Sequence, residues 1–159
     1  MPENQGRSVR MEERDFRRFP TYMIMRLHRA LTAQAVEILS SQSSLNQAEW
    51  RILSTVASGV ATAAREVAIY SNIDPGMISR TLRKLEHEGL ATTSRSESDR
   101  RVLEIKITLK GKRMYEKILP LMLARQERLM AALDPAERKA FSRILSKLQE
   151  VAEEPLQGS

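Results

Sequence analysis

The fold is decided by the stretch DPGMISRTLRKLEHEGL, residues 74–90. Asp74 followed by Pro75 is typical of a helix start, because aspartate accepts hydrogen bonds from unpaired amides and proline lacks an amide that would need a partner. The residues that follow keep a helical spacing as far as Glu88. The stretch therefore predicts a short helix from Pro75 to Glu88.

This helix has an apolar back. Ile78, Leu82 and Leu85 are separated by four and three residues, which places them on one stripe. Gly89 supplies the left-handed residue that ends such a helix, and Leu90 can fold back as its hydrophobic latch. We expect the stripe to pack on a core and the opposite face to stay polar.

The polar front has the composition of a DNA-reading helix, since the major groove admits an α-helix and arginine can fork onto guanine edges or phosphates. Small residues at the amino end allow close approach, and the helix dipole there favours a phosphate. The alternative is that these charges only solvate an exposed face. The candidate DNA-binding residues of this helix are Pro75, Gly76, Ser79, Arg80, Thr81, Arg83 and Lys84.

A short helix and a hairpin flank this element. Residues 63–70 predict the preceding helix, and residues 90–94 and 102–109 predict two strands, the second with clear alternation. Helix, helix and two-stranded hairpin is the order of a winged helix-turn-helix. We expect the helix-turn-helix over residues 63–88 and the wing over residues 90–109.

The tip of the hairpin is charged. A basic finger beside a recognition helix can enter the adjacent minor groove, where A/T-rich tracts concentrate negative potential. Arg95, Asp99, Arg100 and Arg101 are the candidates, and a carboxylate two residues before an arginine can hold its guanidinium in one pose. The alternative is a solvated hairpin with a local ion pair worth ~0–1 kcal/mol.

The charge is concentrated in this region. The 159 residues carry a formal charge of +6, and residues 74–113 hold ten Lys or Arg against six Asp or Glu. A basic balance favours a polyanionic partner, although composition alone also fits a merely soluble basic protein.

The flanking segments predict helices whose apolar faces must be buried against other helices. Residues 19–39 are apolar on more than one face, so we expect a partner subunit to bury them. Asn46 and Glu49 form a capping-box pattern ahead of a stripe that begins at Trp50. A helix from Lys110 toward Ala132 contains Pro120, which predicts a kink or a break.

The last predicted helix opens with Asp134, Pro135 and Glu137, a cap, a first-turn proline and a capping-box acid. Its apolar stripe requires a partner helix, either in the same chain or in a second copy. The stripe consists of Phe141, Ile144, Leu145, Leu148, Val151 and Ala152.

The motifs AEWRIL (48–53), DPGMISRTLRKLEHEGL (74–90) and DRRVLEIKITLKGK (99–112) together resemble the MarR family, over roughly Phe16 to Val151. The resemblance implies a mainly α fold with a small two- to three-stranded antiparallel sheet (α+β). In such a fold the N- and C-terminal helices of two subunits form an intertwined dimerisation domain. It also implies a homodimer on double-stranded DNA, most commonly a repressor, with Arg101 at the wing tip oriented by Asp99.

On this basis we expect a flexible arm over residues 1–15, dimerisation helices over 16–45 and 110–152, a DNA-binding domain over 46–109 and a frayed end over 153–159. The resemblance further implies a small aromatic or anionic effector. The candidate wall residues are Tyr22, Met25, Arg26, His28 and Trp50, and the alternative is that Tyr22, Met25 and Trp50 are plain core.

Several classes have no support in the sequence. The absence of cysteine excludes disulfides and thiol sensing, and the two histidines, His28 and His87, lie far apart, so we expect no metal and no cofactor. We see no catalytic motif and expect no enzyme. Residues 1–18 do not form a secretory signal and no run reaches ~20 apolar residues, so we expect a cytoplasmic protein without a membrane role. The alternative function is a winged-helix module for protein interaction or nucleoid-type binding, without ligand control.

Overall fold

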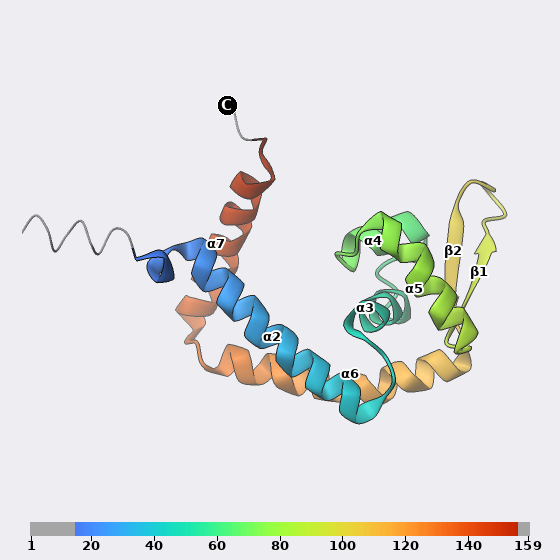
Figure 1. Cartoon of the computed structure of the whole chain (residues 1–159), viewed down its shortest axis with the longest axis horizontal. Coiled ribbons are helices and arrows are strands. Elements are labelled where there is room, and N and C mark those ends of the chain that lie inside the picture. Colours follow the sequence, from blue (N-terminus) through green and yellow to red (C-terminus); the bar gives the residue numbers. More distant parts are fainter. Residues whose placement is uncertain (1–14, 156–159) are drawn as a thin grey trace, which may run out of the picture. The chain divides into compact units, whose positions relative to one another are not determined.

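The computed structural model describes residues 15–155, with the side chain of Pro75 excepted. It is mainly helical with one two-stranded antiparallel sheet, which confirms the expected fold class. Most of the expected N-terminal arm and the last four residues lie outside the described range. The elements are η1 (Phe16–Arg18), α2 (Pro20–Gln42), α3 (Gln47–Ala57), α4 (Ala64–Tyr70), α5 (Pro75–His87), β1 (Ala91–Arg95), β2 (Leu103–Ile107), α6 (Leu109–Ala131) and α7 (Pro135–Glu153) (Figure 1).

The chain divides into two compact units, residues 1–118 and residues 119–159. The first holds η1, α2 to α5, the hairpin and the first part of α6. The second holds the rest of α6 and α7. The expected helix-turn-helix and wing therefore both lie in the first unit.

The predicted caps define the helices of the first unit. At the start of α3 the amide of Glu49 donates to Oδ1 of Asn46 (3.0 Å), and the amide of Asn46 donates to Oε2 of Glu49 (2.9 Å). Both bonds of a capping box are present, as the spacing predicted. Gly59 follows the helix with a φ of +75°, a conformation that favours glycine.

The core of the first unit lies between α3, α4, α5 and β2. The stripe predicted on α5 is confirmed, because Ile78, Leu82 and Leu85 are all buried. Burial of several large aliphatic side chains removes apolar area from water and fixes α5 on the scaffold. The side chains at 0% exposure among these elements are those of Ile52, Leu53, Val67, Leu85 and Ile105.

The hairpin pairs Ala91 with Ile107 at one end and Arg95 with Leu103 at the other. The first strand begins one residue later than predicted, because the amide of Leu90 donates to the carbonyl of Leu85 and so closes α5. A single bridge between Ala63 and Glu104 extends the sheet toward the segment before α4. The third strand that the expected two- to three-stranded sheet allowed is therefore present only as this isolated bridge.

Pro120 lies inside α6, which is one continuous helix from Leu109 to Ala131. The expected break is therefore wrong, and the expected kink stays a prediction. A proline removes one hydrogen bond of the ladder, but the flanking residues KIL and LMLAR are good helix formers that stabilise the turns on either side.

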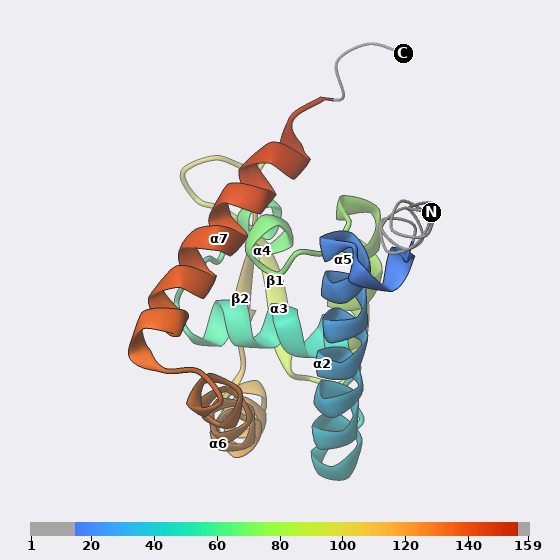
Figure 2. The ribbon, with the colours of Figure 1, turned by 90° about the vertical axis from the view of Figure 1, so that its left-hand side faces the viewer.

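Two helices keep apolar side chains exposed. On α2, which is one uninterrupted helix (Figure 2), only Ala35 and Leu39 are buried. On α7, which carries the predicted cap of Asp134 and Glu137, no residue is buried. The exposed large apolar residues are Met23, Ile24, Met25, Leu27 and Val36 on α2, and Phe141, Ile144, Leu145, Leu148 and Val151 on α7.

Candidate nucleic-acid interface

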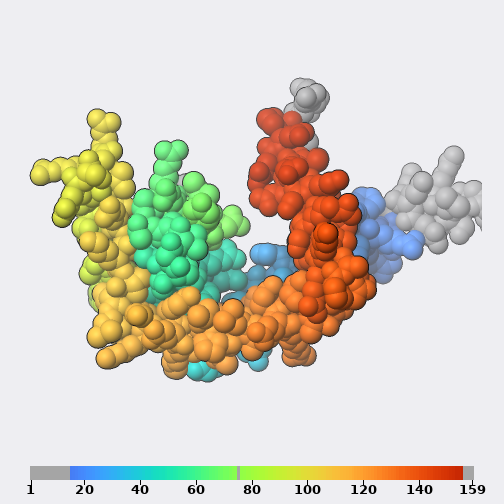
Figure 3. All heavy atoms as spheres, turned by 180° about the vertical axis from the view of Figure 1, so that it is seen from behind, coloured from blue at the N-terminus to red at the C-terminus, as the bar shows by residue number. Residues whose placement is uncertain are grey.

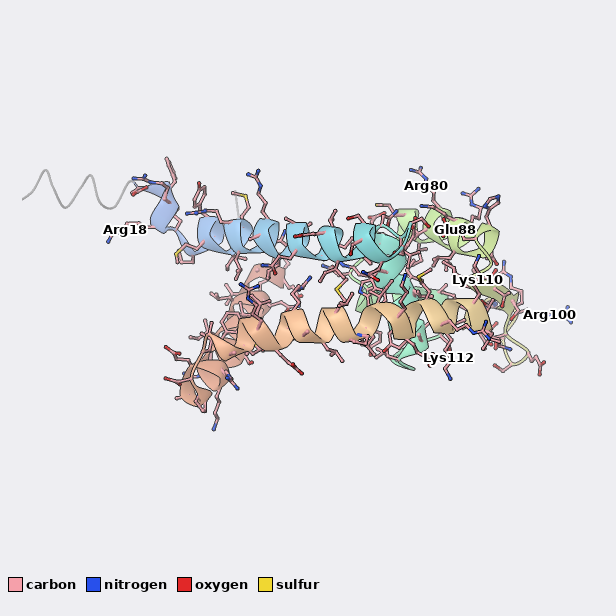
Figure 4. All side chains as sticks on the ribbon, turned by 90° about the horizontal axis from the view of Figure 1, so that it is seen from below. Arg18, Arg80, Glu88, Arg100, Lys110 and Lys112 are labelled. Atoms are coloured by element: carbon pink, nitrogen blue, oxygen red, sulfur yellow. The ribbon has the colours of Figure 1, made fainter. Side chains whose placement is uncertain are left out.

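The exposed face of α5 is polar and basic, as predicted from the sequence. Gly76, Ser79, Arg80 and Arg83 are exposed, and Arg80 projects away from the helix in Figure 4. Nε of Arg83 donates to the carbonyl of Ser79 one turn earlier (3.3 Å), which directs its side chain along the helix. Met77, which sequence reasoning did not select, is 49% exposed on this face. An exposed thioether among polar groups can contact a thymine methyl.

The amino end of α5 is capped from within the chain. Oδ1 of Asp74 accepts a hydrogen bond from the amide of Gly76 (2.8 Å), and Pro75 at the first helical position has no amide to offer. The amide of Met77 donates to the carbonyl of Asp74 (2.8 Å), so two of the amides that could bind a phosphate are already paired. The predicted attraction of this helix end for a phosphate rests on the remaining amides and on the helix dipole.

Two of the predicted contact residues are engaged elsewhere. Thr81 is buried, and its hydroxyl donates to the carbonyl of Met77 (3.0 Å), because this position lies on the core side of the helix. Nζ of Lys84 lies 2.8 Å from Oε1 of Glu49, whose side chain is 1% exposed. The structure thus places Thr81 away from the polar front and turns the ammonium of Lys84 toward α3.

The wing tip is held by backbone contacts and presents arginines to solvent. Nη1 of Arg95 donates to the carbonyl of Arg101 (3.3 Å), and the amide of Arg101 donates to Oδ1 of Asp99 (2.9 Å). Arg100 and Arg101 are exposed, and the tip protrudes from its unit (Figures 3 and 4). The carboxylate of Asp99 therefore fixes the turn through a backbone amide. The expected hold on the guanidinium of Arg101 is replaced by this contact.

Helix α5 and the hairpin are tied together by Glu86. Its Oε1 accepts from the amide of Thr93 (2.9 Å) and from the hydroxyl of Thr93 (2.6 Å). Hydrogen bonds to a charged acceptor are among the stronger ones in proteins. The sequence signal for this contact was an acidic residue within an otherwise basic helix, which the sequence analysis did not use.

The carboxyl end of α5 is joined to the start of α6. Nζ of Lys110 donates to the carbonyl of Glu88 (2.6 Å), and the hydroxyl of Thr108 donates to the carbonyl of Gly89 (2.7 Å). At Gly111 a Cβ atom would lie 2.0 Å from the carbonyl oxygen of Leu90, so only glycine fits this approach. These contacts satisfy carbonyls that a helix end leaves unpaired.

The candidate effector residues are divided between two environments. Trp50 is buried in α3, and its ring stacks on Tyr115 with centroids 5.8 Å apart. The other four lie on α2, where Tyr22 is half-buried and Met25, Arg26 and His28 are exposed. Trp50 is thus a core residue of the first unit, as the alternative interpretation held, and an effector pocket stays a prediction.

Across residues 15–155 no three potential ligands among His, Asp and Glu cluster as a metal site would require. The helices of the same range include none long and apolar enough to span a bilayer.

The segment that holds the candidate interface is similar in sequence to known transcriptional regulators. The sequence model described as "MarR family" matches residues 45–103, which run from just before α3 into β2. The regulator BilQ of Clostridium symbiosum is 29% identical over 89 residues, which are 56% of this chain and 62% of BilQ, so the chain matches less than two thirds of that relative. The repressor Rv2887 of Mycobacterium tuberculosis is 25% identical over 127 residues, 80% of this chain and 91% of the repressor.

Solved structures share the fold. The S. aureus MepR–DNA complex aligns with a TM-score of 0.76 at 16% identity, covering 84% of this chain and 98% of MepR. BpsR of Bordetella bronchiseptica, described with regulation of its DNA binding by 6-hydroxynicotinic acid, aligns with a TM-score of 0.74 at 22% identity, covering 84% of this chain and 95% of BpsR. Residues 45–103, which hold α3 to α5, β1 and the start of β2, are thus similar to the MarR family, and the chain shares its fold with solved structures of transcriptional regulators.

Proposed function

We propose that this protein represses transcription as a homodimer, which binds a pseudo-palindromic operator and releases it when a small effector binds. The observation that carries the proposal is the pairing of two basic surfaces within one unit. Arg80 and Arg83 are exposed on α5, and Arg100 and Arg101 are exposed at the wing tip, while the back of α5 is buried. A helix of this form suits a major groove, and a basic finger beside it suits the adjacent minor groove.

The homodimer is supported by the apolar faces of α2 and α7. Large aliphatic and aromatic side chains stay exposed on both helices, and patches of this kind mark interaction surfaces in water-soluble proteins. Two copies that present one recognition helix each would read two half-sites about one helical turn apart. The proposed dimerisation segments are residues 16–45 and 110–152, and the proposed DNA-binding domain is residues 46–109.

Repression and effector release are supported by the relatives. Rv2887 is named a repressor, and BpsR is named with a small heteroaromatic acid that regulates its DNA binding. In this chain Arg26 offers a cation for such an anion, beside Tyr22, Met25 and His28 on the same helix. Release requires that the effector bind the DNA-free state more tightly than the DNA-bound state.

The test is fluorescence anisotropy with labelled DNA from upstream of the protein's own gene and a scrambled duplex as control. We expect a Kd of ~10⁻⁸–10⁻¹¹ M for an operator. Affinity should fall by several decades between about 50 and 200 mM salt. Equal binding to both duplexes would favour a nucleoid-type role, and no binding at low salt would favour a protein-interaction module.

Release is measured on the same complex by titration with aromatic carboxylates, 6-hydroxynicotinic acid included. A compound that dissociates the wild-type complex should be less effective against Arg26→Ala, because the variant lacks the proposed cation. Equal release of both proteins would remove Arg26 from the proposed pocket.

A further inference from the structure

Lys84 belongs by sequence to the basic front of α5, yet its ammonium is held by a buried carboxylate. Its Nζ lies 2.8 Å from Oε1 of Glu49 on α3 and 3.8 Å from Oε1 of Glu88, the C-cap residue of α5. The side chain of Glu49 is 1% exposed, whereas that of Lys84 is 46% exposed. The pair therefore joins the interior of the first unit to the DNA-facing side of α5.

The carboxylate of Glu49 is held by Asn46 as well as by Lys84. Its Oε2 accepts the amide of Asn46 (2.9 Å), and its Oε1 accepts Nδ2 of Asn46 (2.6 Å). A buried carboxylate costs free energy unless it is paired and hydrogen-bonded, and removal of one partner leaves an uncompensated charge. The ammonium of Lys84 is thus strongly retained by α3.

The same side of α5 is anchored again at its carboxyl end. Nζ of Lys110, in the first turn of α6, donates to the carbonyl of Glu88 (2.6 Å), and the two residues lie together in Figure 4. The C-cap residue Glu88 follows Lys84 by one helical turn. Two polar contacts thus tie the helix to α3 and to α6, in addition to its buried apolar stripe.

We propose that Glu49 and Lys84 are positioning residues, which set the rotation of α5 about its axis and thereby the DNA affinity, without contact between Lys84 and DNA. This inference rests on the proposed function. Side chains end about 5–6 Å from a helix axis, so a rotation of roughly 10° moves their tips by about 1 Å. A shift of that size is enough to misalign Arg80 and Arg83 with a groove, because hydrogen bonds weaken steeply with distance and angle.

The variant Glu49→Gln separates positioning from contact. Glutamine keeps one oxygen for the amide of Asn46, but its amide nitrogen replaces the oxygen that accepts from Nδ2 of Asn46, and the charge that holds Lys84 is lost. Positioning predicts that Kd for the operator duplex rises about 5- to 20-fold, within the range of coupling between contacting residues, while the slope of log K against log salt is unchanged. If Lys84 were instead a phosphate contact restrained by Glu49, its release would tighten binding and steepen the slope by about 0.9. Tighter binding or an unchanged Kd overturns the proposal.

A second variant and a control complete the test. Lys84→Met should also raise Kd without change of the salt slope, and the double variant should bind no more weakly than the weaker single variant, because both remove one interaction. Arg83→Met is the matched neighbour on the exposed face, and it should flatten the slope by about 0.9 if its guanidinium meets a phosphate. A flattened slope for Lys84→Met, or additive losses in the double variant, overturns the proposal.

A measurement without DNA tests the pair independently of the proposed function. In Glu49→Gln, hydrogen exchange of the amides from Ile78 to Lys84 should accelerate about 3- to 10-fold relative to those of α4, which packs on the same core. Equal acceleration in α4 and α5 would show general destabilisation and overturn the positioning role. If the wild-type protein fails to bind DNA while Glu49→Gln still shows the local acceleration, the proposed function alone is refuted.

Discussion

Glu86 of α5 accepts two hydrogen bonds from Thr93 of β1, one from the backbone amide at 2.9 Å and one from the hydroxyl at 2.6 Å. These bonds join the recognition helix to the wing. The two proposed DNA-contacting elements are therefore coupled through one carboxylate, and the spacing between helix and wing depends on it.

Replacement of Glu86 by alanine should lower the free energy of unfolding by about 1–3 kcal/mol, since it leaves the half-buried amide of Thr93 without its charged acceptor. Operator affinity should fall with it, because the wing is no longer tied to α5. Denaturant unfolding and anisotropy at one salt concentration measure the two effects. Thr93→Val, which loses only the hydroxyl bond, should show a smaller loss of stability, and equal losses in both variants would contradict this account of the amide bond.

Replacement of Arg101 by alanine should weaken operator binding without change of oligomeric state. The side chain is exposed at the wing tip and the turn is held by backbone contacts, so its removal leaves the fold intact. The expected loss is about 1–3 kcal/mol of binding free energy if the guanidinium enters a minor groove. Arg143→Ala on α7 controls for the loss of one charge, and an affinity loss no larger than that of this control would mean that the wing does not engage DNA.

Replacement of Leu145 by aspartate should dissociate the proposed dimer, because it places a charge within the apolar stripe of α7. Sedimentation velocity measures the change as a shift from dimer to monomer. Ser146 is the next residue on the same helix and does not belong to the apolar stripe. The variant Ser146→Asp is therefore the matched control and should leave the dimer in place. A Leu145→Asp protein that sediments as the wild type does would remove this stripe from the interface.

The hydrogen bond to Glu49 raises the pKa of Lys84 by more than burial lowers it, and the charges of Glu49 and Glu88 each add a smaller increase. A raised folded-state pKa means that the pair contributes stability at every pH below the ordinary lysine value and loses this contribution as pH rises through the folded value. The difference in Tm between wild type and Lys84→Met should be constant up to pH of about 10 and narrow above it.

Lys112→Met provides the control for this pH profile. Lys112 and Glu116 form an exposed pair at 3.9 Å, and exposed pairs contribute little to stability. The difference in Tm between Lys112→Met and the wild type should therefore be small at every pH. If the difference in Tm between Lys84→Met and the wild type stays constant through the alkaline range, the ammonium of Lys84 does not have the proposed role in its pair with Glu49.

Much of the fold could be predicted because its determinants are local. The cap at Asp74, the left-handed Gly89 and the spacing of Ile78, Leu82 and Leu85 each act within a few residues, so the bounds of α5 follow from them. The second strand is shorter than predicted, since β2 ends at Ile107 and the amide of Thr108 donates to the carbonyl of Leu90, a residue far from it in sequence.

The side-chain partners of the candidate site could not be predicted from local patterns. Lys84 is a typical member of a basic face by spacing, and only the approach of α3 brings Glu49 to its ammonium. Thr81 lies one position from the exposed Arg80, but helical rotation carries it into the core. The spacing of Asp99 and Arg101 indicated a contact between their side chains, whereas in the structure Oδ1 of Asp99 accepts from the backbone amide of Arg101.

The most direct test of the central claim is selection of binding sites by the purified wild-type protein from a random pool of duplexes, followed by sequencing. The account predicts convergence on an inverted repeat whose half-sites are centred about one helical turn apart. The same selection with Arg80→Ala should lose the preference at defined positions within each half-site. A pool that stays random after several rounds, or that converges on a single unrepeated half-site, would contradict sequence-specific binding by a symmetric dimer.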